Sequence, residues 1–161
     1  MDDPIWISSE LAVAIHKRQL AEHGGADGVR DPGLLESALA RPRHAFAYEQ
    51  PTPTIATLAS SYAFGIAKNR AFVDGNKRTA YVVCRTFLLL NGFDLTADRM
   101  SRYEKFLGLA AGSIGEAEFA SWLASHVEPI DPWPQTDKTV HARIPDRKLP
   151  WRLLFSHRIG P

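Results

Sequence analysis

Apolar residues recur at helical spacing in several segments of the chain, and turn signals separate these segments. The densest is residues 79–90, where apolar side chains form an almost continuous run that ends at Asn91-Gly92. This run predicts a mostly buried helix with a glycine stop. Before it, residues 54–68 place apolar side chains on one face, which predicts an amphipathic helix.

Two further helices are expected nearer the N-terminus. Residues 7–10 can cap a helix that stops at the glycine pair 24–25. The pair Asp31-Pro32 combines an N-cap residue with proline in the first turn, and the helix that it opens is expected to stop before Pro42. Residues 43–53 lack periodicity and contain two prolines, so they predict a loop or a short hairpin.

Two more helices are expected after residue 92. Thr96 is a candidate N-cap for a fifth helix, and Ser113 and Glu116 have the spacing of a capping box for a sixth. No segment alternates as a strand would, and no internal repeat is visible. The sequence therefore predicts an all-α domain of about six helices over residues 1–127.

Residues 128–161 differ in composition from this domain. They contain six of the eleven prolines, and aromatic residues alternate there with six basic and four acidic residues. Such interleaving occurs in segments that bind nucleic acid or a protein partner. The excess of two positive charges is small, however, so we expect an irregular C-terminal extension rather than a direct contact with nucleic acid.

The overall composition excludes several classes of protein. The formal net charge of +1 gives no drive toward nucleic acid or acidic membranes. The single cysteine, Cys84, lies within the apolar run and is expected in the core. Met1 is followed by two aspartates rather than by a basic segment, and no apolar run is long enough to span a bilayer. A cytoplasmic protein without a membrane contact is expected.

A polar turn, Asp-Gly-Asn-Lys-Arg at residues 74–78, opens the densest helix. The N-terminus of a helix attracts anions, and Gly75 would let a ligand approach the backbone. The side chains of Asn76, Lys77 and Arg78 could then donate to one polyphosphate. Asp74 could hold a magnesium ion beside the phosphates, and Phe72 could anchor the loop in the core. Spacing alone leaves a second interpretation open, a solvated helix cap with Asp74 as the N-cap.

The stretch AFVDGNKRTA, residues 71–80, resembles the core motif of the Fic/Doc superfamily, whose usual form is His-x-Phe-x-Asp-Gly-Asn-(Gly or Lys)-Arg. Over residues 5–127 other segments are similar to the Doc (death-on-curing) branch, in the right order. They are IHKRQLAEHGG, GVRDPGLLESALARP, SSYAFGIAKN, FLLLNGF and EFASWLASHV.

The resemblance implies a helical fold, binding of ATP and Mg²⁺ at residues 74–78, and membership of a type II toxin–antitoxin module. Doc-type toxins block translation by phosphorylating elongation factor Tu, and a Phd-type antitoxin neutralises them. Lys77 in place of a second glycine, and Tyr81 where AMP-transferring members often have arginine, favour transfer of phosphate over AMP. Residues 43–53 would form the flap that aligns the target segment. His16 is expected to face the cleft.

Arg70 departs from the family pattern, because it occupies the position of the histidine that acts as general base. Arginine stays protonated at neutral pH and cannot accept the proton, and losing a general base typically costs on the order of 10²–10⁴ in rate. The chain is either an inactivated toxin or a natural member with lost or altered activity. A non-catalytic protein that binds antitoxin and nucleotide, and an AMP-transferring enzyme, are the alternatives.

Overall fold

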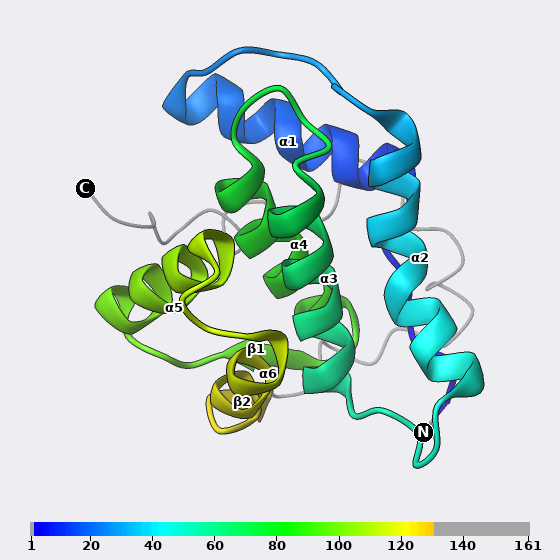
Figure 1. Cartoon of the computed structure of the whole chain (residues 1–161). Helices are drawn as coiled ribbons and strands as arrows, with labels where there is room; N and C mark the ends of the chain where they lie inside the picture. The colour runs from blue at the N-terminus through cyan, green and yellow to red at the C-terminus, as the bar shows by residue number, and fades with distance from the viewer. Residues whose placement is uncertain (1, 131–161) are drawn as a thin grey trace.

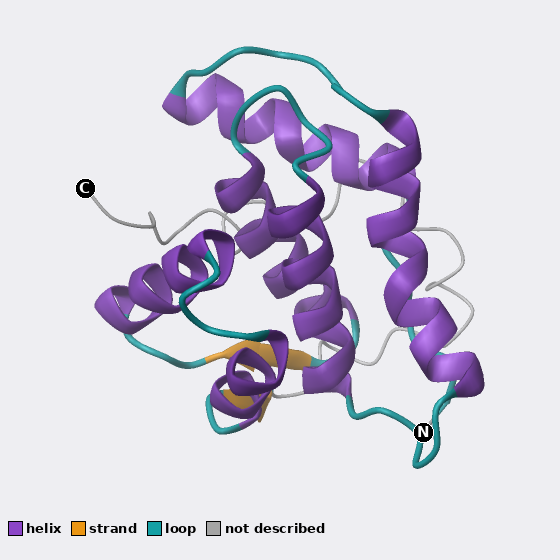
Figure 2. Cartoon of the chain, viewed as in Figure 1, coloured by secondary structure: helices purple, strands orange, loops and turns teal. Residues whose placement is uncertain are grey.

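The computed structural model describes residues 2–130, which form six helices and two short strands (Figure 2). The helices are α1 (Ser9–His23), α2 (Pro32–Tyr48), α3 (Ile55–Asn69), α4 (Asn76–Leu90), α5 (Arg99–Ala111) and α6 (Glu116–Ala124). The strands are β1 (Phe93–Leu95) and β2 (Val127–Pro129), and they pair in antiparallel fashion. The prediction of a helical domain of about six helices is confirmed. From residue 131 onward, the expected C-terminal extension lies outside the residues that the structure describes.

Helices α3 and α4 stand together at the centre of the molecule, and the other helices surround them (Figure 1). Helix α1 crosses one end of the pair, α2 flanks one side and α5 the other, and α6 lies beside the strands at the end opposite α1. Every residue of α4 from Thr79 to Leu88 is buried, as the continuous apolar run predicted. Among residues 2–130, no helix has the length and apolar character needed to cross a membrane.

Close packing between α2 and α3 depends on a glycine. A Cβ atom built on Gly65 would lie 3.1 Å from the Cα atom of Ala38 and 3.3 Å from its carbonyl oxygen. These neighbours are mainly backbone, which cannot move aside as a flexible side chain can. Gly65 therefore allows the two helices to pack closely at this point.

The expected stop before Pro42 is wrong, because α2 continues through the proline to Tyr48. Proline at this position removes one helical hydrogen bond and usually kinks a helix. Here Pro42 is buried on the same face as Leu35 and Leu39, so packing of that face offsets the lost bond. The expected flap is consequently shorter than residues 43–53, because only residues 49–54 connect α2 to α3.

The N-caps of the first two helices are as predicted, but those of the last two are not. Asp98, rather than Thr96, caps α5 by accepting a hydrogen bond from the backbone of Ser101. Thr96 instead continues the strand pairing, and both its N–H and its hydroxyl donate to the carbonyl oxygen of His126. Helix α6 begins at Glu116 without a side-chain cap, because Ser113 closes the end of α5 on Gly108.

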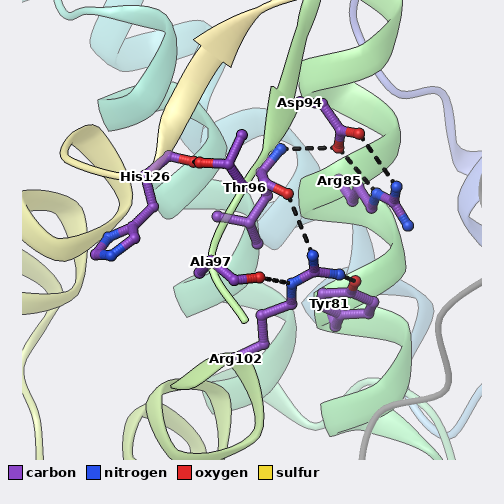
Figure 3. A network of polar contacts seen from close by, with 8 residues as sticks. Tyr81, Arg85, Asp94, Thr96, Ala97, Arg102 and His126 are labelled. Carbon is purple, nitrogen blue, oxygen red and sulfur yellow. Dashed lines mark hydrogen bonds and ion pairs between the residues drawn. The ribbon is translucent and has the colours of Figure 1, made fainter. Parts of the chain in front are cut away.

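The two strands are the other departure from the sequence prediction, and a polar network holds them against α4 (Figure 3). Arg85 of α4 forms a two-bond ion pair with Asp94 of β1, at 3.0 and 3.1 Å. Arg102 of α5 donates to the carbonyl oxygen of Ala97 and to the hydroxyl of Tyr81. Three-residue strands carry too little alternation to be detected in a sequence.

Candidate phosphate-binding site

A short loop of residues 70–75, which we call the motif loop, connects the two central helices. The polar turn begins in this loop and continues into the first turn of α4. Arg70 ends α3 in the left-handed conformation, with φ 49° and ψ 48°. It is the one residue other than glycine with a positive φ among residues 2–130. Gly75, at φ 75°, precedes α4, whose first turn has no side-chain cap. Asp74 therefore does not act as the N-cap that the second interpretation required.

The side chain of Asn76 closes the motif loop. Its amide nitrogen donates to the carbonyl oxygen of Phe72 at 2.9 Å, and its amide oxygen accepts from the N–H of Phe72 at 3.0 Å. We expected this carboxamide to face an anion, and in this structure both of its ends are engaged within the loop. Asn76 thus shapes the turn, while its predicted contact with a nucleotide stays a prediction.

Phe72 fixes the loop to the core. Its ring is fully buried and stacks on His16 of α1, with ring centres 3.9 Å apart and planes 8° apart. The Nε2 atom of His16 lies 2.7 Å from the carbonyl oxygen of Asp74, a hydrogen bond in which the imidazole N–H donates. His16 therefore lies beneath the motif loop and holds it in place, rather than facing the open cleft.

A second loop, residues 24–31 between α1 and α2, runs beside the motif loop (Figure 1). Several hydrogen bonds join the two loops. Val73 donates to the carbonyl oxygen of Gly28 at 3.0 Å, and Arg30 donates to that of Ala71 at 2.7 Å. The backbone of Ala26 donates to the Asp74 carboxylate at 3.3 Å. The sequence showed this loop only as a glycine-rich connection, and it gave no sign of this pairing.

Arg30 extends the pairing with its side chain. Its Nε atom donates to the carbonyl oxygen of Arg70 at 2.9 Å, and its Nη2 atom donates to that of Asn69 at 3.2 Å. The last carbonyl groups of a helix lack partners within the helix and carry partial negative charge, so a guanidinium stabilises them. Arg30 holds the end of α3 and the strained turn at Arg70, although no motif marks this residue in the sequence.

A pocket of about 760 Å³ opens over the motif loop. Four cationic side chains line it, from Arg30, Arg70, Lys77 and Arg78, and the carboxylate of Asp74 is the one acidic group among its lining residues. Its opposite wall is apolar and comes from Ala67 at the end of α3 and from Leu107, Ala110 and Ala111 of α5. The pocket is thus suited to a ligand that carries several negative charges.

The four cations differ in how they are engaged. Arg30 is bonded to α3, and Arg78 donates to the carbonyl oxygen of Gly24 at 3.1 Å. The ammonium of Lys77 lies 5.7 Å from the centre of the Tyr103 ring. The exposed side chain of Arg70 has no hydrogen bond, ion pair or ring contact with any residue between 2 and 130.

The Asp74 carboxylate is exposed and ionised at neutral pH. Hydrogen bonds from the backbone N–H groups of Gly75 and Ala26 lower its pKa below the usual 3.8, with a smaller contribution from the positive charge of Arg78. No group of three or more potential metal ligands occurs among residues 2–130. Each carboxylate oxygen of Asp74 keeps a lone pair free, so Asp74 fits a magnesium ion that takes its other ligands from phosphate and water.

No residue that lines the pocket can act as a general base of the expected kind. None of the lining residues is a histidine, and the Nε2 atom of His16 is already engaged with the backbone of Asp74. Tyr81 is buried in the core with its hydroxyl bonded to Arg102, so it does not contribute to the pocket. The described side chains can therefore hold an anion, but the lining residues offer no histidine beside it, and their one carboxylate, Asp74, accepts hydrogen bonds from two backbone N–H groups.

Comparison with known proteins places this arrangement in a family. Residues 6–88, more than half of the chain, match the Fic/DOC family. The chain therefore belongs to the Fic/DOC family, and the resemblance noted for residues 71–80 is confirmed.

Two curated relatives lie in the Doc branch. The chain is 32% identical to "Protein kinase doc" of Escherichia phage P1 over 117 residues, which cover 73% of this chain and 91% of that protein. It is 44% identical to "Toxin Doc" of Mycolicibacterium smegmatis (strain ATCC 700084 / mc(2)155) over 75 residues. That alignment covers 47% of this chain and 58% of the toxin.

Proposed function

We propose that this chain is a Doc-like toxin of a type II toxin–antitoxin module, built to transfer phosphate from ATP to a protein hydroxyl. The carrying observation is the pocket over the motif loop, in which four cations and one ionised carboxylate surround the start of α4. The names of the two relatives, a toxin and a protein kinase, support the same assignment.

In this proposal Lys77 and Arg78 bind the phosphates with the backbone of Gly75, and Asp74 holds Mg²⁺ against them. Bound Mg²⁺ neutralises phosphate charge. Asn76 positions the turn through its two bonds to Phe72. Lys77 projects from α4 where a glycine would leave open backbone, which favours a nucleotide that presents its terminal phosphate rather than its α-phosphate to the acceptor.

The expected partners follow from the Doc branch. Elongation factor Tu is the proposed acceptor protein, and a Phd-like antitoxin is the proposed inhibitor. The shortened connection at residues 49–54, with the end of α2, would align the acceptor segment.

Arg70 makes this chain inactive or nearly so in the proposed reaction, because it stands where the proton acceptor is needed. The test is the Arg70→His variant, purified and assayed for phosphate transfer from ATP to elongation factor Tu. The expected result is a gain of on the order of 10²–10⁴ in rate over the parent chain. The Arg70→Gln variant is the matched control, because it removes the cation without supplying a base. A folded Arg70→His variant that remains inert would contradict the proposal.

A second candidate function is a non-catalytic protein that binds the antitoxin and nucleotide. The cation at position 70 and the lack of a histidine among the pocket-lining residues favour it. An AMP-transferring enzyme is a weaker candidate, because Tyr81 is buried with Arg102 and leaves no second arginine at that turn of α4.

A further inference from the structure

We infer that Arg70 is itself a ligand for the terminal phosphate of a nucleoside triphosphate, so that this chain retains the nucleotide where a base-bearing relative would consume it. The inference rests on the proposed function, in that the pocket is taken to receive ATP. It goes further by giving the Arg70 side chain a binding role, instead of treating it only as a lost base.

The backbone at Arg70 has the left-handed conformation. A left-handed backbone at a residue other than glycine is strained and persists only where its surroundings enforce it. Here they do, because Arg30 holds the carbonyl oxygens of both Asn69 and Arg70, and its own backbone bonds Ala71. The turn is fixed, and it directs the Arg70 side chain to the wall of the pocket.

The four cations of the pocket differ in how many of their donors are already bonded. The donors of Arg30 and Arg78 are partly occupied by backbone carbonyl groups, and the ammonium of Lys77 lies near the Tyr103 ring. The guanidinium of Arg70, by contrast, has no partner among residues 2–130. It has all five donors available, in the fork geometry that matches a phosphate.

The charges around the pocket also favour a bound polyanion. Four cations around one carboxylate repel one another, and a bound polyanion relieves that repulsion. A charge-assisted bond from guanidinium to phosphate is roughly twice as strong as a neutral one. Because Arg70 is exposed, salt screens this contribution, and the effect should be largest at low ionic strength.

Calorimetry at pH 8 provides the test, since a histidine introduced at position 70 is then neutral. The full chain and its Arg70→His and Arg70→Gln variants are titrated with ATP, ADP, AMP and inorganic triphosphate. We expect both variants to bind ATP and triphosphate about tenfold more weakly than the parent, which corresponds to about 1.4 kcal/mol. AMP, which lacks the terminal phosphates, should show no difference between the three proteins.

Lys17→Gln is the matched control, because it removes one positive charge from an exposed residue of α1 that does not line the pocket. It should bind ATP as the parent does. Thermal unfolding without nucleotide verifies that each variant is folded, and Arg70→Asn, which tolerates the left-handed backbone, replaces any variant that is not.

The outcomes separate the inference from the proposed function. If the parent does not bind ATP, the proposed function fails and the inference fails with it. If the parent binds ATP and both variants bind equally well or better, Arg70 is no phosphate ligand, while the proposed function survives. An equal loss for ATP and AMP, or a loss with Lys17→Gln, would show a general charge effect and would overturn the inference.

Discussion

Arg30 and Arg70 lie forty residues apart, and the guanidinium of the first donates to the backbone carbonyl of the second at 2.9 Å. The contact joins the loop between α1 and α2 to the end of α3. It fixes the backbone from which the motif loop starts, so a cation outside the motif helps to determine the shape of the site.

The Arg30→Gln substitution tests this contact between Arg30 and the end of α3. It should lower the free energy of unfolding by about 1 kcal/mol, because two carbonyl groups at the end of α3 lose a charged donor on an exposed surface. In an Arg70→Gly background the loss should be smaller, since glycine adopts the left-handed conformation without strain. Denaturant unfolding of the four proteins measures both quantities. Equal losses in the two backgrounds would mean that Arg30 does not act through position 70.

The reaction type can be tested with labelled nucleotide in the Arg70→His background. Lys77 in place of glycine favours a nucleotide that presents its terminal phosphate, so γ-labelled ATP should label elongation factor Tu and α-labelled ATP should not. The Asp74→Ala variant of the same protein is the control for label that does not pass through the site. Transfer of the α-label would show that the chain moves AMP and that Lys77 has been misinterpreted.

Asp74 predicts a pH dependence of stability. Its pKa in the folded chain is lowered, because the N–H groups of Gly75 and Ala26 stabilise the ionised form. Its contribution is therefore complete above the unfolded pKa and is lost as the pH falls through the folded pKa. Asp74→Asn should be less stable than the parent at pH 7, and the difference should narrow below about pH 4. Urea unfolding at pH 7 and at pH 3 gives the comparison, and a difference independent of pH would contradict it.

The ion pair between Arg85 and Asp94 should matter more for stability than an exposed pair does. The Arg85 side chain is 5% exposed, so Asp94→Ala would leave a buried charge without its partner. The expected loss is about 3 kcal/mol. Glu22→Ala, which removes the partner of an exposed arginine on α1, should cost about 0.5 kcal/mol or less. Chemical denaturation measures the free energy of unfolding of both variants. Similar small losses for Asp94→Ala and Glu22→Ala would contradict the prediction that the buried pair matters more.

The sequence predicted the helical fold where one feature dominated locally. The apolar run of α4 and the N-caps at Ser8 and Asp31 are examples, because each depends on residues within one or two turns. The prediction was wrong at Pro42, where burial against a distant helix outweighs the local cost of proline. It was also wrong at Thr96, whose partner His126 is thirty residues away.

The site shows the same difference between local signals, which can be predicted from the sequence, and contacts between residues far apart in the chain, which cannot. Residues 72 and 74–78 were selected from the motif, and the structure places Asp74, Gly75, Lys77 and Arg78 around one pocket with Arg70. Arg30 and the loop between α1 and α2 were missed, because their contacts join backbone groups of two irregular segments. Backbone groups are the same at every residue, so a single sequence does not record which of them pair. The apolar wall from α5 was missed for a related reason, since alanines in a helix give no sign of facing a cleft.

The pairing of the loop at residues 24–31 with the motif loop also bears on how the site can be lost. The two loops are joined by backbone hydrogen bonds, and many residues of both loops are exposed to solvent. The helices on either side, by contrast, are packed into the core. Hydrogen bonds at an exposed surface open more readily than those of a packed core. If the hydrogen bonds between the two loops broke briefly, Arg70, Asp74 and Arg78 would leave their arrangement while every helix remained intact. The lifetime of the arrangement around the pocket is therefore set by two loops rather than by the global stability of the domain.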